Sequence, residues 1–121
     1  MTVIHGIVVD CANPIELGAF WHEVLGWEYR RHSEGWVSLR NPDGGPHLGF
    51  DRVPEGKTVK NRVHIDIRPV DRSRDEERAR LESLGATVLR LVDDNPDDPH
   101  EIMADPEGNE FCLVEPGLAG T

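Results

Sequence analysis

The chain repeats its own pattern, and this internal repeat constrains its fold more than any other feature. The segment Val3-Ile4-His5-Gly6-Ile7 aligns with Arg62-Val63-His64-Ile65-Asp66, so that His5 and His64 lie 59 positions apart. The same offset places Leu25-Gly26 on Leu84-Gly85, and residues 41–44 match residues 105–108 at an offset of 64. Three landmarks in the same order predict two copies of one structural unit, with a short insertion in the second copy.

The first copy has the pattern of one strand, one helix and three further strands. Residues 3–9 are apolar and β-branched, as in a strand. Asn13, Pro14 and Glu16 form the start of a helix, in which apolar residues then recur at helical spacing up to Leu25. Gly26 is a plausible end of this helix. We expect the three following strands at 28–32, 36–40 and 46–53, with a tight turn at 41–44.

The second copy follows the same order after a polar linker. We expect its first strand at 62–68, a capping box of Ser73 and Glu76 that opens a polar helix to residue 84, and strands at 87–92, 101–104 and 110–115. The acidic insertion, residues 93–98, lacks the pattern of an EF-hand loop and is interpreted as a solvated loop. The predicted organisation is therefore a single domain with module 1 at 1–53, a linker at 54–60, module 2 at 61–116 and a loose tail at 117–121.

Composition limits the possible partners and the location. The formal net charge is −10, which disfavours nucleic acid and anionic membrane surfaces as partners. Two cysteines, Cys11 and Cys112, are too few for a disulfide framework. Residues 1–10 have no signal-peptide pattern, and no apolar run is long enough to span a membrane. We therefore expect a cytoplasmic protein.

Several motifs resemble the vicinal oxygen chelate superfamily, and in particular its glyoxalase-like domain proteins. They are residues 4–10 (IHGIVVD), 24–27 (VLGW), 63–66 (VHID) and 105–111 (DPEGNEF). The resemblance implies an α+β fold in which two βαβββ modules form a cup-shaped mixed sheet, with ligands on the concave face. A ferredoxin-like sheet is the alternative, but three strands after each helix argue against it. The superfamily includes glyoxalase I, extradiol dioxygenases and bleomycin-binding proteins, so the resemblance leaves the reaction open.

Metal-dependent relatives in this superfamily hold a divalent ion with residues of the first and last strands of each module. At the matching positions the repeat places His5, Leu48, His64 and Cys112. Leu48 cannot coordinate a metal, so the sequence favours a pocket without a metal over one that binds Zn, Fe, Ni or Mn. If an ion binds, we expect His5, His64 and Cys112 to hold it.

Strand alternation predicts which other side chains line the pocket. We expect His64 and Asp66, which share one face of their strand, to be the catalytic acid/base pair. The other predicted pocket residues are Trp36, Ser38, Leu48, Phe50, His100 and Cys112. Trp36 and Phe50 could instead belong to the core of the hairpin, and Phe50 fits the core better.

Two functions are compatible with this sequence. The first is an enzyme that binds a small organic molecule in the cup and acts on it by isomerase, lyase or dioxygenase-like chemistry, with a metal or with His and Asp alone. The alternative is a protein that binds a small molecule or drug without chemistry, as bleomycin-resistance proteins do. The resemblance also implies a homodimer.

Overall fold

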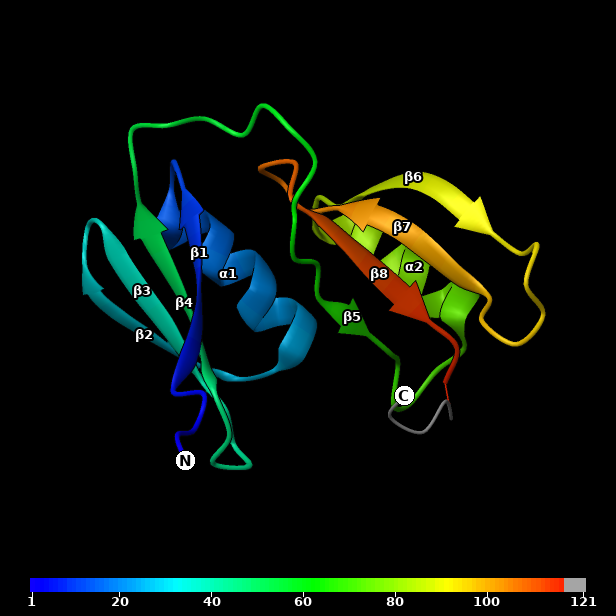
Figure 1. Cartoon of the computed structure of the whole chain (residues 1–121), viewed down its shortest axis with the longest axis horizontal. Helices are drawn as coiled ribbons and strands as arrows, with labels where there is room; N and C mark the ends of the chain where they lie inside the picture. The colour runs from blue at the N-terminus through cyan, green and yellow to red at the C-terminus, as the bar shows by residue number, and fades with distance from the viewer. Residues whose placement is uncertain (117–121) are drawn as a thin grey trace. The chain divides into compact units, whose positions relative to one another are not determined.

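The computed structural model describes residues 1–116 and has the predicted α+β architecture (Figure 1). The chain divides into two compact units, Met1–Thr58 and Val59–Thr121, called here the first and the second unit. Each contains one strand, one helix and three further strands, so the two βαβββ modules expected from the repeat are confirmed. The predicted tail, residues 117–121, lies outside the described residues.

The first unit is a four-stranded mixed sheet with a helix packed on one face. Its elements are β1 (Gly6–Cys11), α1 (Pro14–Leu25), β2 (Glu28–Ser33), β3 (Trp36–Arg40) and β4 (His47–Arg52), and the strand order is β1-β4-β3-β2. The Asn13 side chain accepts a hydrogen bond from the N–H of Glu16 at the start of α1, and Gly26 ends the helix in the left-handed conformation that glycine adopts readily. The predicted helix bounds are confirmed.

The second unit repeats this topology. Its elements are β5 (Asp66–Ile67), α2 (Arg74–Leu84), β6 (Thr87–Val92), β7 (His100–Ala104) and β8 (Glu110–Val114), in the order β5-β8-β7-β6. Both hydrogen bonds of the predicted capping box between Ser73 and Glu76 are present. The first strand is shorter than the expected 62–68. Just before it, the Asn61 N–H donates to the Glu110 carboxylate rather than to a backbone carbonyl.

In both units the first strand pairs in parallel with the last strand, and this pairing leaves one face of the sheet open. In the first unit the side chain of Val37 faces α1, because a Cβ on Gly18 of that helix would lie 2.6 Å from Val37 Cγ1. Leu39 shares the face of Val37 by alternation, and the two residues pair with Leu48 and Phe50. All four side chains are buried on the helix side.

The prediction that Leu48 lines the pocket is therefore wrong, because Leu48 belongs to the core of the first unit. For Phe50 the pocket prediction is wrong and the alternative, a core position, is confirmed. The turn after β3 spans residues 41–46, whereas the turn after β7 spans 105–109, one residue fewer. The offset between the copies falls from 64 to 63 across this turn. A shift of one residue moves a side chain to the other face of a sheet. The residue equivalent to Cys112 is Gly49.

The pairing register also shows that the predicted equivalence of His5 and His64 is wrong. Asp66 pairs with Cys112, as Val8 pairs with Gly49, so the first strands are related by an offset of 58 rather than 59. The equivalent of His64 is therefore Gly6. His5 lies before β1, where its ring meets the His47 ring edge-on at 4.9 Å between centroids.

The core of the second unit contains a buried charge. Glu101 on β7 is fully buried at the position that Val37 occupies in the first unit. Its carboxylate is hydrogen-bonded and ion-paired to Arg78 of α2, and Arg74 Nε lies 4.0 Å away. The polar helix expected from the sequence thus turns arginines towards the sheet, and Leu81 is its buried apolar side chain. The buried apolar side chains of β7 and β8 include Met103, Phe111 and Leu113.

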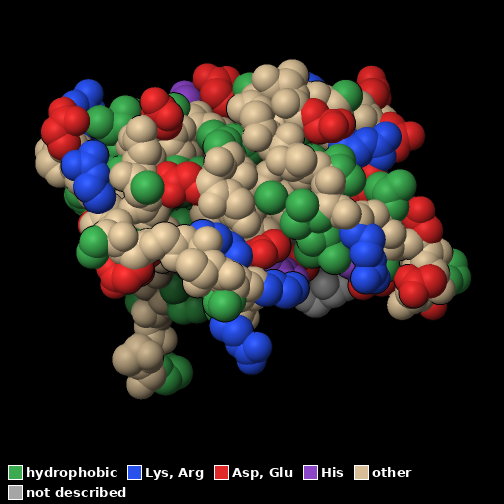
Figure 2. Space-filling model, turned by 90° about the horizontal axis from the view of Figure 1, so that it is seen from above, with side chains coloured by type: hydrophobic (Ala, Val, Ile, Leu, Met, Phe, Trp, Pro, Cys, Tyr) green, Lys and Arg blue, Asp and Glu red, His purple; other side chains and the backbone are tan. Residues whose placement is uncertain are grey.

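The surface carries charges of both signs. Figure 2 shows Asp and Glu side chains interspersed with Lys and Arg over one face of the molecule. Several large apolar side chains are also exposed, among them Ile4, Val63, Leu89 and Leu91. Within residues 1–116, neither helix has the length and apolar character needed to cross a membrane.

The buried ion pair generates a stability prediction. We expect Glu101→Ala to lower the free energy of unfolding by roughly 3 kcal/mol, because it removes the buried carboxylate from Arg78 and leaves that guanidinium only its pair with the exposed Asp75. Glu34→Ala is the control, since Glu34 forms an exposed pair with Arg31 and its loss costs at most about 1 kcal/mol. Urea unfolding followed by circular dichroism measures both. Equal losses for the two variants would contradict a structural role of the buried pair.

Candidate functional site

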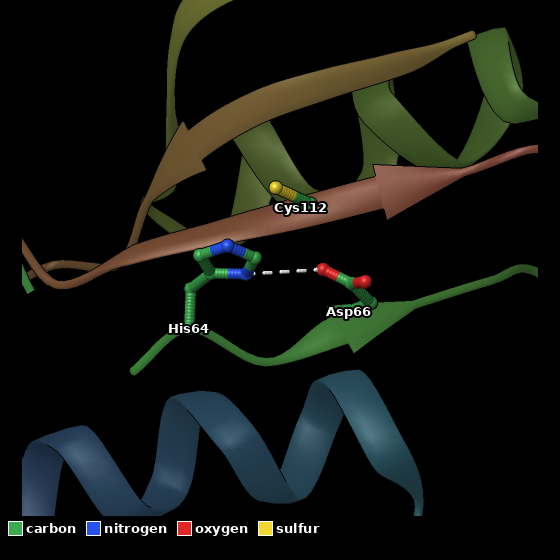
Figure 3. A group of neighbouring side chains, drawn as sticks. All are labelled: His64, Asp66 and Cys112. Carbon is green, nitrogen blue, oxygen red and sulfur yellow. Dashed lines mark hydrogen bonds and ion pairs between the residues drawn. The ribbon is translucent and has the colours of Figure 1, made fainter. Parts of the chain in front are cut away.

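Three side chains of different chemistry meet on the open face of the second unit (Figure 3). One ligand atom each of His64, Asp66 and Cys112 lies within 4.8 Å of the others. Asp66 and Cys112 are side by side because their strands, β5 and β8, pair in register at these residues. His64 lies two residues before Asp66, so it stands on the same face.

His64 and Asp66 form a hydrogen-bonded pair. His64 Nδ1 lies 3.2 Å from Asp66 Oδ1, and the tautomer with a proton on Nδ1 donates this bond. That arrangement leaves Nε2 of the neutral ring as a proton acceptor. Both side chains are exposed, at 46% and 57%, so a ligand and solvent can reach them.

Cys112 differs from its two neighbours because it is buried. Burial is the main cause that raises the pKa of its thiol to about 11, and the negative charge of Asp66 acts in the same direction. Without a metal, the side chain is therefore a neutral thiol at pH 7 and a poor nucleophile.

These residues line a cavity of about 280 Å³ that belongs wholly to the second unit. Its polar lining comes from Lys60, His64, Asp66, Asp98, His100 and Glu110, and its apolar lining from Ile102, Cys112 and Val114. The cavity is large enough for a small ligand, although it lies just below the usual range of roughly 300–1,000 Å³. Three carboxylates against one lysine favour a neutral or cationic ligand.

The structure brings together four of the residues predicted from the sequence: His64, Asp66, His100 and Cys112. Trp36 and Ser38 lie on the open face of the first unit, where His32 stacks on Trp36 and its Nε2 lies 2.7 Å from Ser38 Oγ. The predicted metal trio of His5, His64 and Cys112 draws on both units and stays a prediction.

Sequence reasoning missed part of the cavity wall. Glu110 and Val114 alternate with Cys112 along β8, so the strand pattern could have identified them. Lys60 and Asp98 come from the linker and the acidic insertion, where no periodic pattern fixes the side-chain direction. Residues 93–98 are exposed, as expected of a solvated loop, and Asp98 also lines the cavity, where its carbonyl lies 2.9 Å from His100 Nδ1.

Within residues 1–58, glycines stand at two of the positions where the second unit has metal-ligating side chains. The residues equivalent to His64 and Cys112 are Gly6 and Gly49. A Cβ on Gly6 would lie 2.3 Å from the His47 ring, and a Cβ on Gly49 would lie 2.5 Å from the Trp36 ring. Two aromatic rings therefore cover the positions at which the second unit presents its ligand atoms.

The donor set of the second unit fits a divalent metal ion. Ligand atoms around a tetrahedral ion lie roughly 3.5 Å apart, as bond lengths of about 2.0–2.3 Å require. The observed separations, at most 4.8 Å, can close to this value by rotation of the exposed His64 and Asp66 side chains. Three protein ligands beside a cavity also leave a coordination position for a ligand molecule.

Comparisons with known proteins agree with this architecture. The family described as "Glyoxalase-like domain" matches residues 6–114 of the chain. No curated protein matches it.

Solved structures share the fold at low sequence identity. An enzyme of the glyoxalase/bleomycin resistance protein/dioxygenase family from Burkholderia phytofirmans PsJN is similar, with a TM-score of 0.76, 15% identity and coverage of 93% of this chain and 98% of that chain. Protein ATC0852 from Agrobacterium tumefaciens has a TM-score of 0.77, 20% identity and coverage of 99% and 100%. The fosfomycin resistance protein FosX from Listeria monocytogenes, a mutant complexed with Mn(II) and a dihydroxypropylphosphonic acid, has a TM-score of 0.77, 14% identity and coverage of 98% and 93%.

The environment of Cys112 generates a prediction for its reactivity. In a Cys11→Ser background Cys112 is the sole thiol, and we expect iodoacetamide in the presence of a chelator to alkylate it at least about 100-fold more slowly at pH 7.5 than it alkylates free cysteine. The reason is that a pKa near 11 leaves far less thiolate at this pH. The rate should rise with pH up to about pH 11. Mass spectrometry of quenched samples gives the rates, and a plateau above pH 9 would contradict the raised pKa.

Proposed function

Because the chain belongs to the glyoxalase-like domain family, we propose that it binds a small organic molecule in the cavity of the second unit and moves a proton on it with His64. The observation that carries this proposal is the His64–Asp66 hydrogen bond of 3.2 Å at the cavity wall. Asp66 holds the imidazole in one orientation and stabilises the imidazolium that forms when Nε2 accepts a proton.

The rest of the cavity supports this chemistry. Ile102 and Val114 offer apolar contact to the body of a ligand, while Lys60 can stabilise negative charge on a carbonyl oxygen. The neutral Cys112 thiol does not compete with His64 as a base. A divalent ion on His64, Asp66 and Cys112 would instead supply Lewis-acid polarisation of a ligand oxygen in place of base chemistry by His64, and the FosX mutant is complexed with Mn(II).

The test measures proton transfer directly. Chelator-treated protein is incubated in D₂O with neutral and amine-bearing carbonyl compounds that shift backbone NMR signals of residues 100–114. We expect the ¹H NMR signal of the C–H next to the carbonyl to disappear faster than in a blank, and His64→Gln to lower this rate by roughly 10²–10⁴-fold. Asp66→Asn should lower the exchange rate by less, because this variant loses the carboxylate that orients the His64 ring but keeps the imidazole base.

His22→Gln is the matched control, since His22 lies in α1 of the first unit and bonds the carbonyl of Trp27. It should exchange the ligand proton at the wild-type rate. If bound compounds exchange no faster than the blank, the acid/base proposal is wrong.

The second candidate is capture of a ligand without chemistry. It is favoured by the cavity charge, because the described residues that line the cavity include the three carboxylates of Asp66, Asp98 and Glu110 but one lysine, Lys60. On this hypothesis cationic aromatic compounds stabilise the protein by mass action, and Glu110→Gln weakens their binding. A thermal-shift screen that finds such compounds, together with no proton exchange, would select this candidate.

We also propose that the protein is a cytoplasmic homodimer. The exposed apolar side chains Ile4, Ile7 and Val8 around β1, and Leu89 and Leu91 on β6, support burial against a second chain. Neither cysteine forms a disulfide within residues 1–116, as expected in a reducing compartment. Sedimentation equilibrium at micromolar concentration should give twice the chain mass of 13.6 kDa. A monomer mass would refute the dimer.

A further inference from the structure

The site has a chemical property that the proposed acid/base function does not use. Its three potential ligands are an imidazole nitrogen, a carboxylate oxygen and a thiol sulfur, and all come from the second unit. We propose that His64, Asp66 and Cys112 form a metal site carried by this unit alone, and that Cys112 makes it select Zn²⁺ over Mn²⁺ and Mg²⁺.

The backbone holds the ligands where a metal needs them. Asp66 and Cys112 are fixed on neighbouring strands by the β5–β8 ladder, in which the Cys112 N–H also donates to the Ile65 carbonyl at 2.9 Å. His64 precedes Asp66 by two residues and leans towards it. Only exposed side chains have to rotate, so the metal can bind without a change in the sheet.

The order of preference follows from the ligand atoms. Thiolate sulfur is a soft ligand that suits zinc and other late first-row ions, whereas manganese and magnesium prefer sites built from oxygen. A set of one sulfur, one nitrogen and one oxygen therefore favours Zn²⁺. This choice differs from the Mn(II) found with the FosX relative.

The charges around the site are compatible with a dication. Asp98 and Glu110 add two carboxylates to the cavity wall, and Lys60 is the single cationic side chain among the described residues that line it. The Glu110 carboxylate already accepts a hydrogen bond from the Asn61 N–H. We therefore expect it to attract the cation through its negative charge rather than to coordinate it. The ion enters a cavity whose lining is negative overall.

This inference is independent of the proposed function. A zinc ion on His64 occupies the ring that acts as the base, so metal-loaded protein should lose the proton exchange that chelator-treated protein catalyses. Absence of exchange in metal-free protein would remove the acid/base proposal and leave the metal site untouched. Absence of metal binding would remove the metal site and leave the acid/base proposal untouched.

Cobalt(II) is the spectroscopic probe for zinc. Titration of chelator-treated, untagged protein with Co²⁺ should produce a sulfur-to-cobalt charge-transfer band in the near ultraviolet that saturates at one ion per chain. Zn²⁺ should abolish the band at one equivalent, whereas Mn²⁺ and Mg²⁺ in large molar excess should leave it unchanged. Native mass spectrometry should report one bound zinc.

Matched variants assign the ligands. Cys112→Ser should lose the band and Cys11→Ser should keep it, because Cys11 lies in the first unit with its thiol bonded to the Asp51 carbonyl. His64→Gln and Asp66→Asn should weaken Co²⁺ binding at least tenfold while circular dichroism stays unchanged, whereas His47→Gln should bind normally. A band that survives Cys112→Ser, displacement by Mn²⁺ at one equivalent, or no band in the wild-type protein would each overturn the proposal.

Discussion

The parallel pairing of the first strand with the last strand is the interaction on which each unit depends. It closes a βαβββ unit by joining segments far apart in the chain, such as Asp66 and Cys112. The helix between them can then pack on one face of the sheet only, so the opposite face stays open. Every ligand atom of the candidate site projects from that open face because of this ladder, and a change of register by one residue would bury the site against the helix.

The two units differ in the side chains that lie between the helix and the sheet. In the first unit an apolar stripe of α1 packs on Val37, Leu39, Leu48 and Phe50. In the second unit α2 is polar, and Arg78 pairs with Glu101 where the first unit has Val37. A buried ion pair is a costly replacement for a valine, since desolvation offsets most of its attraction. It does, however, link α2 to β7 in a helix whose buried side chains are Glu77 and Leu81 only.

On the open faces it is the second unit that carries polar side chains beside a cavity, whereas the first unit carries aromatic rings. The first unit carries Gly6 and Gly49 under the rings of His47 and Trp36, whereas the second carries His64 and Cys112 beside a cavity. One copy thus fills its open face with its own aromatic side chains, and the other leaves space for a ligand. The repeat in the sequence predicts two equivalent units, but the described cluster of His64, Asp66 and Cys112 lies in one of them.

The sequence by itself determined the two βαβββ units, both helices with their caps, and four of the residues that meet in the cavity. Local rules suffice for these features, because hydrophobic period, capping residues and strand alternation act within one element. It placed Leu48 and Phe50 in the pocket, although one extra turn residue after β3 shifts the register and reverses the faces. It matched His64 with His5, although the register of the first strands relates the two copies by an offset of 58 rather than 59. Only the tertiary structure decided that Asp66 lies beside Cys112, that Lys60 and Asp98 reach the same cavity, and that glycines and rings cover the first unit. These are contacts between segments distant in the chain, and the pairing of strands, rather than any local pattern, sets them.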